Sequence, residues 1–201
     1  MRAIIFDIDG TLIESMAVDT ELYFGAITEV LGAVSLRNLV DYEHVTDNGI
    51  LAQVLADNGH DHDPAVMAAI KGLFVSGIRA HIESVGPFSE IHGATGFFDR
   101  ARASDDVSVA VATGGWRESA SLKLASAGFD LAGIPLLTSD DANARADIMQ
   151  LALREAGDQI ESVTYFGDAE WDRRACEELG WDFVAVGPNL DGIETYDGFD
   201  L

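Results

Sequence analysis

Basic residues are scarce in this chain. Among its 201 residues, 12 are Lys or Arg and 35 are Asp or Glu, which gives a formal net charge of −23 at pH 7. So acidic a surface repels the phosphates of nucleic acids and of anionic membranes, and we expect neither as a partner. It also attracts no anionic substrate from a distance. A phosphate site in this chain would therefore need a metal ion and a few local hydrogen-bond donors.

Cysteine and long apolar runs are also nearly absent. Cys176 is the single cysteine, so no internal disulfide can form and an oxidising compartment is not implied. The first residues do not form the apolar stretch of a signal peptide, because Asp7 and Asp9 interrupt it. No continuous apolar run reaches the roughly 18 residues of a membrane helix. We therefore expect a cytoplasmic protein.

Several short apolar runs are typical of buried parallel strands. They are continuous and rich in β-branched residues, as expected for strands covered on both faces. These runs are AIIF (3–6), VSVAVA (107–112), IPLLT (134–138), SVTYFG (162–167) and DFVAV (182–186). The helical patterns between them are those of residues 117–128, 145–157 and 172–180. This alternation predicts an α/β fold with a doubly wound, mostly parallel sheet of Rossmann-like type.

One long segment interrupts that alternation. About a hundred residues separate the first run from the second, far more than a single crossover needs. Residues 16–84 have mostly helical patterns, and Asp63 followed by Pro64 is a good pair for starting a helix. We therefore predict an α/β core domain formed by residues 1–15 and 85–201, with an α-helical domain formed by residues 16–84 inserted into it.

Acidic residues and a hydroxyl follow three of the predicted strands. In an open α/β sheet, ligands bind beyond the carboxyl ends of the strands, so these residues should meet at one rim. They are Asp7, Asp9, Thr113, Gly114, Asp168 and Asp172. Such crowded carboxylates repel one another unless a cation offsets their charge. Mg²⁺ suits this position, because it prefers one or two carboxylates together with waters and phosphate oxygens.

These motifs resemble those of the haloacid dehalogenase (HAD) superfamily. DIDGT (7–11) matches the family's first motif, VAVATGG (109–115) matches the second, and GDAEWD (167–172) matches the fourth. All three follow predicted strands in the family's order, and the helical insert is similar to the family's C1-type cap. The resemblance covers essentially the whole chain and implies a C1-capped, phosphoglycolate-phosphatase-like hydrolase.

The resemblance also implies roles for the residues of the first two motifs. Asp7 would be the nucleophile that forms an aspartyl-phosphate, and it would contact the metal. Asp9 would act as acid and then as base, and its backbone carbonyl would bind the metal. Thr113 and the backbone N–H of Gly114 would hold the transferring phosphoryl group at a helix N-terminus.

The later motifs are less regular. Asp168 would bind Mg²⁺ directly and Asp172 through a water or as an outer acceptor, although Asp172 equally suits an N-cap. The family usually places a lysine before the fourth strand, but no lysine follows Lys123. Arg145 is our candidate for that catalytic and phosphate-binding role, because a guanidinium can pair with carboxylate and phosphate together. The alternative is an ordinary solvated residue at a helix start.

The sequence thus predicts a Mg²⁺-dependent phosphatase, monomeric or homodimeric, that acts on a small phosphorylated metabolite. A phosphomutase of the β-phosphoglucomutase type would share every core motif. A 2-haloacid dehalogenase would share Asp7 but needs neither Mg²⁺ nor the second aspartate. A non-catalytic binding module is the alternative outside the enzymes. Thr46, Asp47 and Asn48 could face the site from the insert, although a plain N-cap explains them as well.

Overall fold

A single parallel sheet forms the centre of the molecule. The computed structural model describes residues 1–200, and its five strands lie in the order β3-β2-β1-β4-β5. Their bounds are β1 Arg2–Phe6, β2 Val107–Ala112, β3 Leu136–Leu137, β4 Ser162–Gly167 and β5 Asp182–Ala185. Each strand matches a predicted run to within three residues at either end. The α/β fold with a doubly wound parallel sheet is therefore confirmed.

The third strand is much shorter than the predicted 134–138. Pro135 has no backbone N–H, so it contributes to the sheet only by accepting a hydrogen bond from the N–H of Val111 (2.8 Å). The chain then turns at Thr138, whose N–H donates to Asp141 Oδ2 (2.9 Å). Two residues are left for the ladder between these two constraints.

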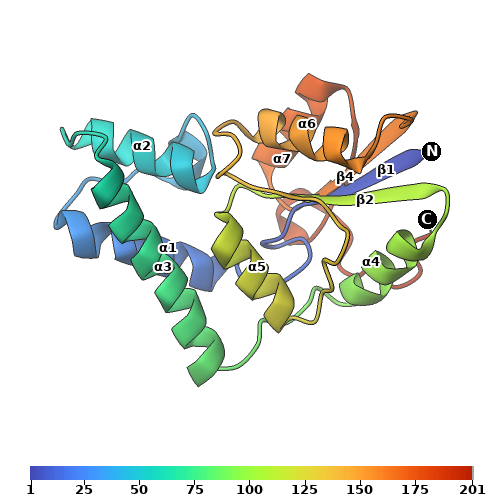
Figure 1. Cartoon of the computed structure of the whole chain (residues 1–201), viewed down its shortest axis with the longest axis horizontal. Helices are drawn as coiled ribbons and strands as arrows, with labels where there is room; N and C mark the ends of the chain where they lie inside the picture. Colours follow the sequence, from blue (N-terminus) through green and yellow to red (C-terminus); the bar gives the residue numbers. More distant parts are fainter. Residues whose placement is uncertain (201) are drawn as a thin grey trace.

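Helices cover both faces of the sheet, which explains the continuous apolar runs. They are α4 (Ala94–Ala103) and α5 (Arg117–Ser126) on one face, and α6 (Arg145–Ala156) and α7 (Glu170–Leu179) on the other (Figure 1). Ala3 and Ile5 of β1 pack into the cluster beneath α6 and α7, whereas Ile4 and Phe6 pack into the cluster that includes α4 and α5. Successive residues of the strand are thus buried on opposite faces.

The first three helices after β1 form a group apart from the helices on the faces of the sheet. They are α1 (Met16–Leu31), α2 (Asp47–Asp57) and α3 (Pro64–Ser84), which we call the cap helices, with a short 3-10 helix at Leu39–Asp41. They lie together beside the sheet, at the end away from the N-terminus (Figure 1). Their apolar side chains join the same cluster as those of α4 and α5. A boundary between two domains at residues 15 and 85 therefore stays a prediction.

Helix α3 bears on the expectation that the chain has no membrane-spanning helix. It is the one helix within residues 1–200 whose length and composition would suit a membrane span. Here it packs against α1 and α5, with Ile70, Phe74 and Ile78 buried, and Lys71 pairs with Asp140 of the core. In this structure α3 is a packed helix of the cap, and the absence of a membrane partner stays a prediction.

Candidate active site

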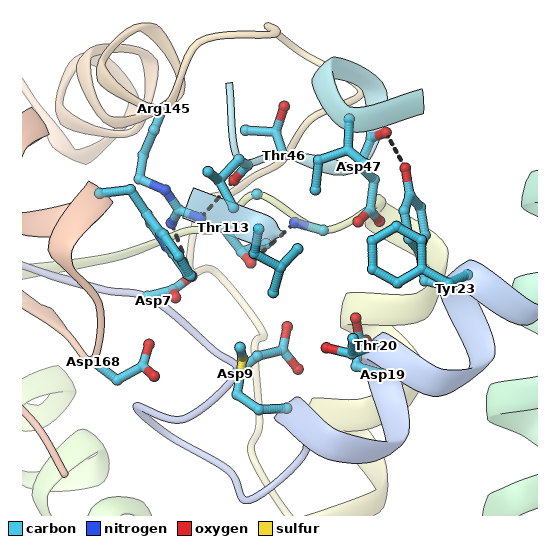
Figure 2. A pocket seen from close by; sticks show the side chains of 18 residues that line it. Asp7, Asp9, Asp19, Thr20, Tyr23, Thr46, Asp47, Thr113, Arg145 and Asp168 are labelled. Atoms are coloured by element: carbon cyan, nitrogen blue, oxygen red, sulfur yellow. Dashed lines mark hydrogen bonds and ion pairs between the residues drawn. The ribbon is translucent and has the colours of Figure 1, made fainter. Parts of the chain in front are cut away.

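Strand ends and helix starts converge on one cavity between the sheet and the cap helices. Its volume is about 70 Å³, and six of the seven residues to which the family motifs give a site role line it. Those lining it are Asp7, Asp9, Thr113, Gly114, Arg145 and Asp168. Figure 2 shows Asp7, Asp168 and Arg145 at one end, which we call the core end, and Asp19 and Asp47 at the other, the cap end. Asp172 lies behind this surface and is fully buried.

Three carboxylates crowd the core end. Asp7, Asp168 and Asp172 each offer an oxygen, and these oxygens lie within 4.8 Å of one another. Burial, and then the charge of Asp7, raises the pKa of Asp168 to about 7, and burial likewise raises the pKa of Asp7. One buried oxygen of Asp7 and one of Asp168 have no hydrogen-bond partner within residues 1–200. A hard divalent cation would fill that deficit, so the residues present fit Mg²⁺.

Gly10 allows this crowding. Its φ is +79°, in the left-handed region, and a Cβ at this position would overlap the carboxylate of Asp168. Glycine is therefore required both by the backbone conformation and by the close approach of Asp168.

Arg145 supplies the positive charge at the core end. Its Nη1 lies 2.9 Å from Asp172 Oδ1 and 3.4 Å from Asp7 Oδ1, and its Nη2 donates to the carbonyl of Val45 (3.2 Å). The side chain is 11% exposed, so it is not a solvated residue at a helix start. Its Nε has no hydrogen-bond acceptor within residues 1–200, and its Nη1 meets the two carboxylates as ion pairs without hydrogen-bond geometry. An anion in the cavity would find free donors there.

Asp172 combines two local functions. Helix α7 begins at Glu170, two residues earlier than predicted, so Asp172 is its third residue and not its N-cap. Its Oδ2 accepts a hydrogen bond from the N–H of Ala169 (3.2 Å), and its Oδ1 pairs with Arg145. Burial raises the pKa of Asp172 to about 8, against the lowering effect of Arg145. Asp172 therefore fixes both the helix start and the guanidinium.

The loop after β2 closes the cavity between the two ends. Thr113 Oγ1 accepts a hydrogen bond from the N–H of Gly115 (3.2 Å), which orients the hydroxyl. A Cβ on Gly114 would lie 2.7 Å from Arg145 Nη2 and 2.9 Å from the carbonyl of Val45. Only glycine fits between the guanidinium and the cap at this point.

A second buried cation was not foreseen from the sequence. Lys123 of α5 is fully buried; its Nζ lies 2.5 Å from Asp9 Oδ1 and also pairs with Asp19 of α1. The sequence did contain a sign of this burial, because Lys123 lies on the same helix face as Ala120 and Leu124, which are also buried. A lysine on the apolar face of a helix is rarely there without a buried partner.

The start of α2 holds the cap helices against the core. Thr46 is its N-cap, accepting from the N–H of Gly49, and its hydroxyl also donates to the carbonyl of Asn143 (2.8 Å). Asn48 accepts from the indole N–H of Trp116 (2.7 Å) and donates to the carbonyl of Ser139 (2.6 Å). Thr46 is thus the N-cap of α2, and both Thr46 and Asp47 line the cavity, whereas Asn48 does not.

The chain is a hydrolase by family. The model for haloacid dehalogenase-like hydrolases matches residues 1–180, and the chain belongs to that family, which confirms the resemblance found in the motifs. No protein among the curated sequences matches it.

Solved structures share the fold at low sequence identity. A hydrolase from Pseudomonas syringae is 18% identical, with a TM-score of 0.74, over 92% of this chain and 84% of that one. CbbY from Rhodobacter sphaeroides, in complex with phosphate, is 19% identical, with a TM-score of 0.71, over 98% and 89%. β-Phosphoglucomutase from Clostridium difficile is 12% identical, with a TM-score of 0.69, over 95% and 86%. At these identities the similarity establishes the fold and leaves the substrate open.

Proposed function

We propose that this hydrolase is a Mg²⁺-dependent phosphatase that acts in the cytoplasm on a small phosphorylated metabolite through an aspartyl-phosphate on Asp7. The observation that carries the proposal is the core end of the cavity. There one buried oxygen of Asp7 and one of Asp168 accept no hydrogen bond within residues 1–200, and Arg145 forms an ion pair with Asp7. This combination suits the binding of both a divalent cation and a phosphate ester.

The cation would be held by Asp7, by Asp168 and by the backbone carbonyl of Asp9, with Asp172 as an outer acceptor. When bound, it would offset the charge of the carboxylates and of the phosphoryl group. Asp172 holds Arg145 through an ion pair, so its contribution is mainly one of position.

In the first step, a carboxylate oxygen of Asp7 attacks phosphorus, and the bond from phosphorus to the organic oxygen breaks. Asp9 gives its proton to that leaving oxygen. In the second step, Asp9 takes a proton from a water molecule, which attacks phosphorus, releases inorganic phosphate and restores Asp7. Each step moves one proton at one carboxylate.

The contacts of Asp9 suit a residue that transfers protons. Its Oδ1 accepts from Lys123 (2.5 Å) and from the hydroxyl of Ser15, so the carboxylate is held in one orientation. Its Oδ2 has no hydrogen-bond partner within residues 1–200, and the residue lines the cavity. We assign the proton transfer to Oδ2. Thr113, the N–H of Gly114 and Arg145 would hold the phosphoryl oxygens.

A phosphatase is favoured over the alternatives. A phosphomutase must hold a bisphosphate intermediate, which needs cationic groups for the second phosphate, whereas the cap end of the cavity carries Asp19 and Asp47. A dehalogenase releases a halide ion, which leaves without taking up a proton. In such an enzyme Asp9 would have no leaving group to protonate.

Phosphate release from a panel of small phosphate esters tests the proposal, with and without Mg²⁺, in the wild type and in Asp7→Asn. We expect turnover that requires both the metal and Asp7. Turnover that survives in Asp7→Asn would contradict the mechanism. Halide release from a chloroacid without metal, in the absence of phosphatase activity, would instead establish the dehalogenase.

A further inference from the structure

The cap end of the cavity contains two acids with no assigned task. Asp19 comes from α1 and Asp47 from α2, and both line the same cavity as Asp7 (Figure 2). They approach from the side opposite Arg145 and Asp168, so a phosphoryl group held at the core end would direct its organic part toward them.

Asp47 is held firmly and still keeps one oxygen free. The residue is 8% exposed, and its Oδ2 accepts from the backbone N–H of Trp116 (2.8 Å). Its backbone carbonyl accepts from the hydroxyl of Tyr23 (2.5 Å). Its Oδ1 accepts no hydrogen bond within residues 1–200. This oxygen borders the cavity and is available to accept a hydrogen bond from a ligand there.

The charges at the cap end do not balance. Three acids, Asp9, Asp19 and Asp47, share one cation, since Arg145 belongs to the core end. That cation is Lys123, whose Nζ already pairs with Asp9 and Asp19. Asp47 has no cationic partner within residues 1–200, and burial together with the charge of Asp19 raises the pKa of its carboxyl. A cation in the cavity would stabilise the charged form of this side chain.

Apart from Thr20 and Thr46, which carry hydroxyl groups, the other walls at this end are apolar or aromatic. Met16, Phe24, Leu39 and Ile50 line the cavity together with the ring of Tyr23. Aromatic rings stabilise a nearby cation, and apolar walls strengthen its attraction to a carboxylate. None of these groups offers a positive charge to an anion.

We propose that the cap end selects phosphate monoesters whose organic part carries an ammonium group, with Asp47 Oδ1 as its principal acceptor and Asp19 as the second. This inference rests on the proposed phosphatase function and specifies its substrate class. A substrate with a carboxylate or a second phosphate at this end would face two acids, and we expect it to be rejected.

Three esters of the same length test the proposal: 2-aminoethyl phosphate, 2-hydroxyethyl phosphate and phosphoglycolate. They place an ammonium, a hydroxyl and a carboxylate at corresponding positions. With Mg²⁺, we expect kcat/KM to be at least about tenfold higher for the amine than for the alcohol, and at least about a hundredfold higher than for the acid. A preference for the alcohol or the acid would overturn the inference.

A matched pair of variants tests whether Asp47 causes the preference for the amine over the alcohol. Asp47→Asn keeps an acceptor for the N–H of Trp116 but loses the charge, so the ratio of amine to alcohol should fall about tenfold. Glu21→Gln removes an exposed acid of α1 outside the cavity and should leave the ratio unchanged. An unchanged ratio in Asp47→Asn would remove Asp47 from recognition.

The failure of this inference can be told from failure of the phosphatase itself. Mg²⁺-dependent turnover that is lost in Asp7→Asn but shows no amine preference would overturn only the inference. If none of the three esters is hydrolysed, calorimetry with Asp7→Asn and Mg²⁺ still decides between the organic groups. Binding of 2-aminoethyl phosphate no tighter than that of phosphoglycolate would overturn the inference in that case.

Discussion

The two ends of the cavity each combine three acids with one buried cation, yet their geometry differs. At the core end, oxygens of Asp7, Asp168 and Asp172 lie within 4.8 Å of one another, around a point. At the cap end, the acids surround the space that a substrate would fill (Figure 2). Converging carboxylates suit a metal ion, whereas separated carboxylates suit an organic cation. The same residue type thus serves two kinds of ligand, and its spacing decides which.

The two cations also differ in what surrounds them. Arg145 touches the proposed nucleophile, and its Nε has no hydrogen-bond acceptor within residues 1–200, so it can bind a substrate anion as well. Lys123 is paired by Asp9 and Asp19 and does not line the cavity. We therefore assign Arg145 to the transferring phosphoryl group and Lys123 to positioning Asp9 and the cap.

Removal of the buried lysine should have the largest effect on stability. Lys123→Met leaves Asp9 and Asp19 without their cation, which should lower the free energy of unfolding by about 3–5 kcal/mol. Urea denaturation measures this change. The chain's only other lysine is the control: Lys71, which is 31% exposed, pairs with Asp140, and Lys71→Met should cost less than about 1 kcal/mol. Equal costs for the two variants would contradict the positioning role.

Removal of the buried arginine should act on catalysis as well as on stability, because Asp172 also loses its cation. Arg145→Ala should lower kcat by about a hundredfold to a thousandfold, because a donor to the developing phosphoryl charge is lost. Circular dichroism would show whether the fold is kept. Arg174→Ala, on the exposed side of α7, is the control and should retain wild-type turnover. A rate near wild type for Arg145→Ala would remove this residue from the site.

The pH dependence of stability tests the cap end separately. Burial raises the pKa of Asp19 from its ordinary 3.8 to about 6, although Lys123 opposes the shift. The folded protein therefore binds this proton more firmly than the unfolded chain does. The resulting stability is present below about pH 4 and is lost as the pH rises through 6, with a limit of about 3 kcal/mol.

Asp19→Asn should not show this loss. Its free energy of unfolding, measured in urea at pH 4 and at pH 7, should fall less with rising pH than that of the wild type. Glu21→Gln serves as the control on the same helix. Parallel profiles for Asp19→Asn and the wild type would contradict the burial of a protonated Asp19.

Metal binding should give the smallest stability effect, and it should be confined to the core end. Mg²⁺ at a hundred times its dissociation constant should stabilise the wild type by about 2.7 kcal/mol. Asp168→Asn should lose most of this gain, whereas Asp47→Asn should keep it. A thermal shift with and without Mg²⁺ measures both. Stabilisation retained by Asp168→Asn would place the cation elsewhere.

The core end could be predicted from the sequence because it depends on local patterns. A strand buried on both faces is a continuous apolar run, and parallel strands end at the same rim, so Asp7, Thr113 and Asp168 had to meet there. The length of β3 could not be predicted, since it depends on how Asp141 turns the chain at Thr138.

The cap end could not be predicted in the same way. Lys123 is 114 positions from Asp9 in sequence, and their contact depends on how α5 packs against the cap helix α3 and the sheet. Asp47 faces the cavity because the start of α2 is fixed by contacts with Trp116. These contacts join segments with no shared motif, so only the folded chain brings them together.

The most direct test of the central claim is to trap the phosphoryl group on the enzyme. A substrate ester labelled in its phosphate is mixed with the enzyme and Mg²⁺, quenched in acid within milliseconds, and the modified peptide is identified by mass spectrometry. We predict covalent phosphate on Asp7, dependent on Mg²⁺ and absent from Asp7→Asn. Label on any other residue, or phosphate release by Asp7→Asn at a rate near wild type, would contradict the account.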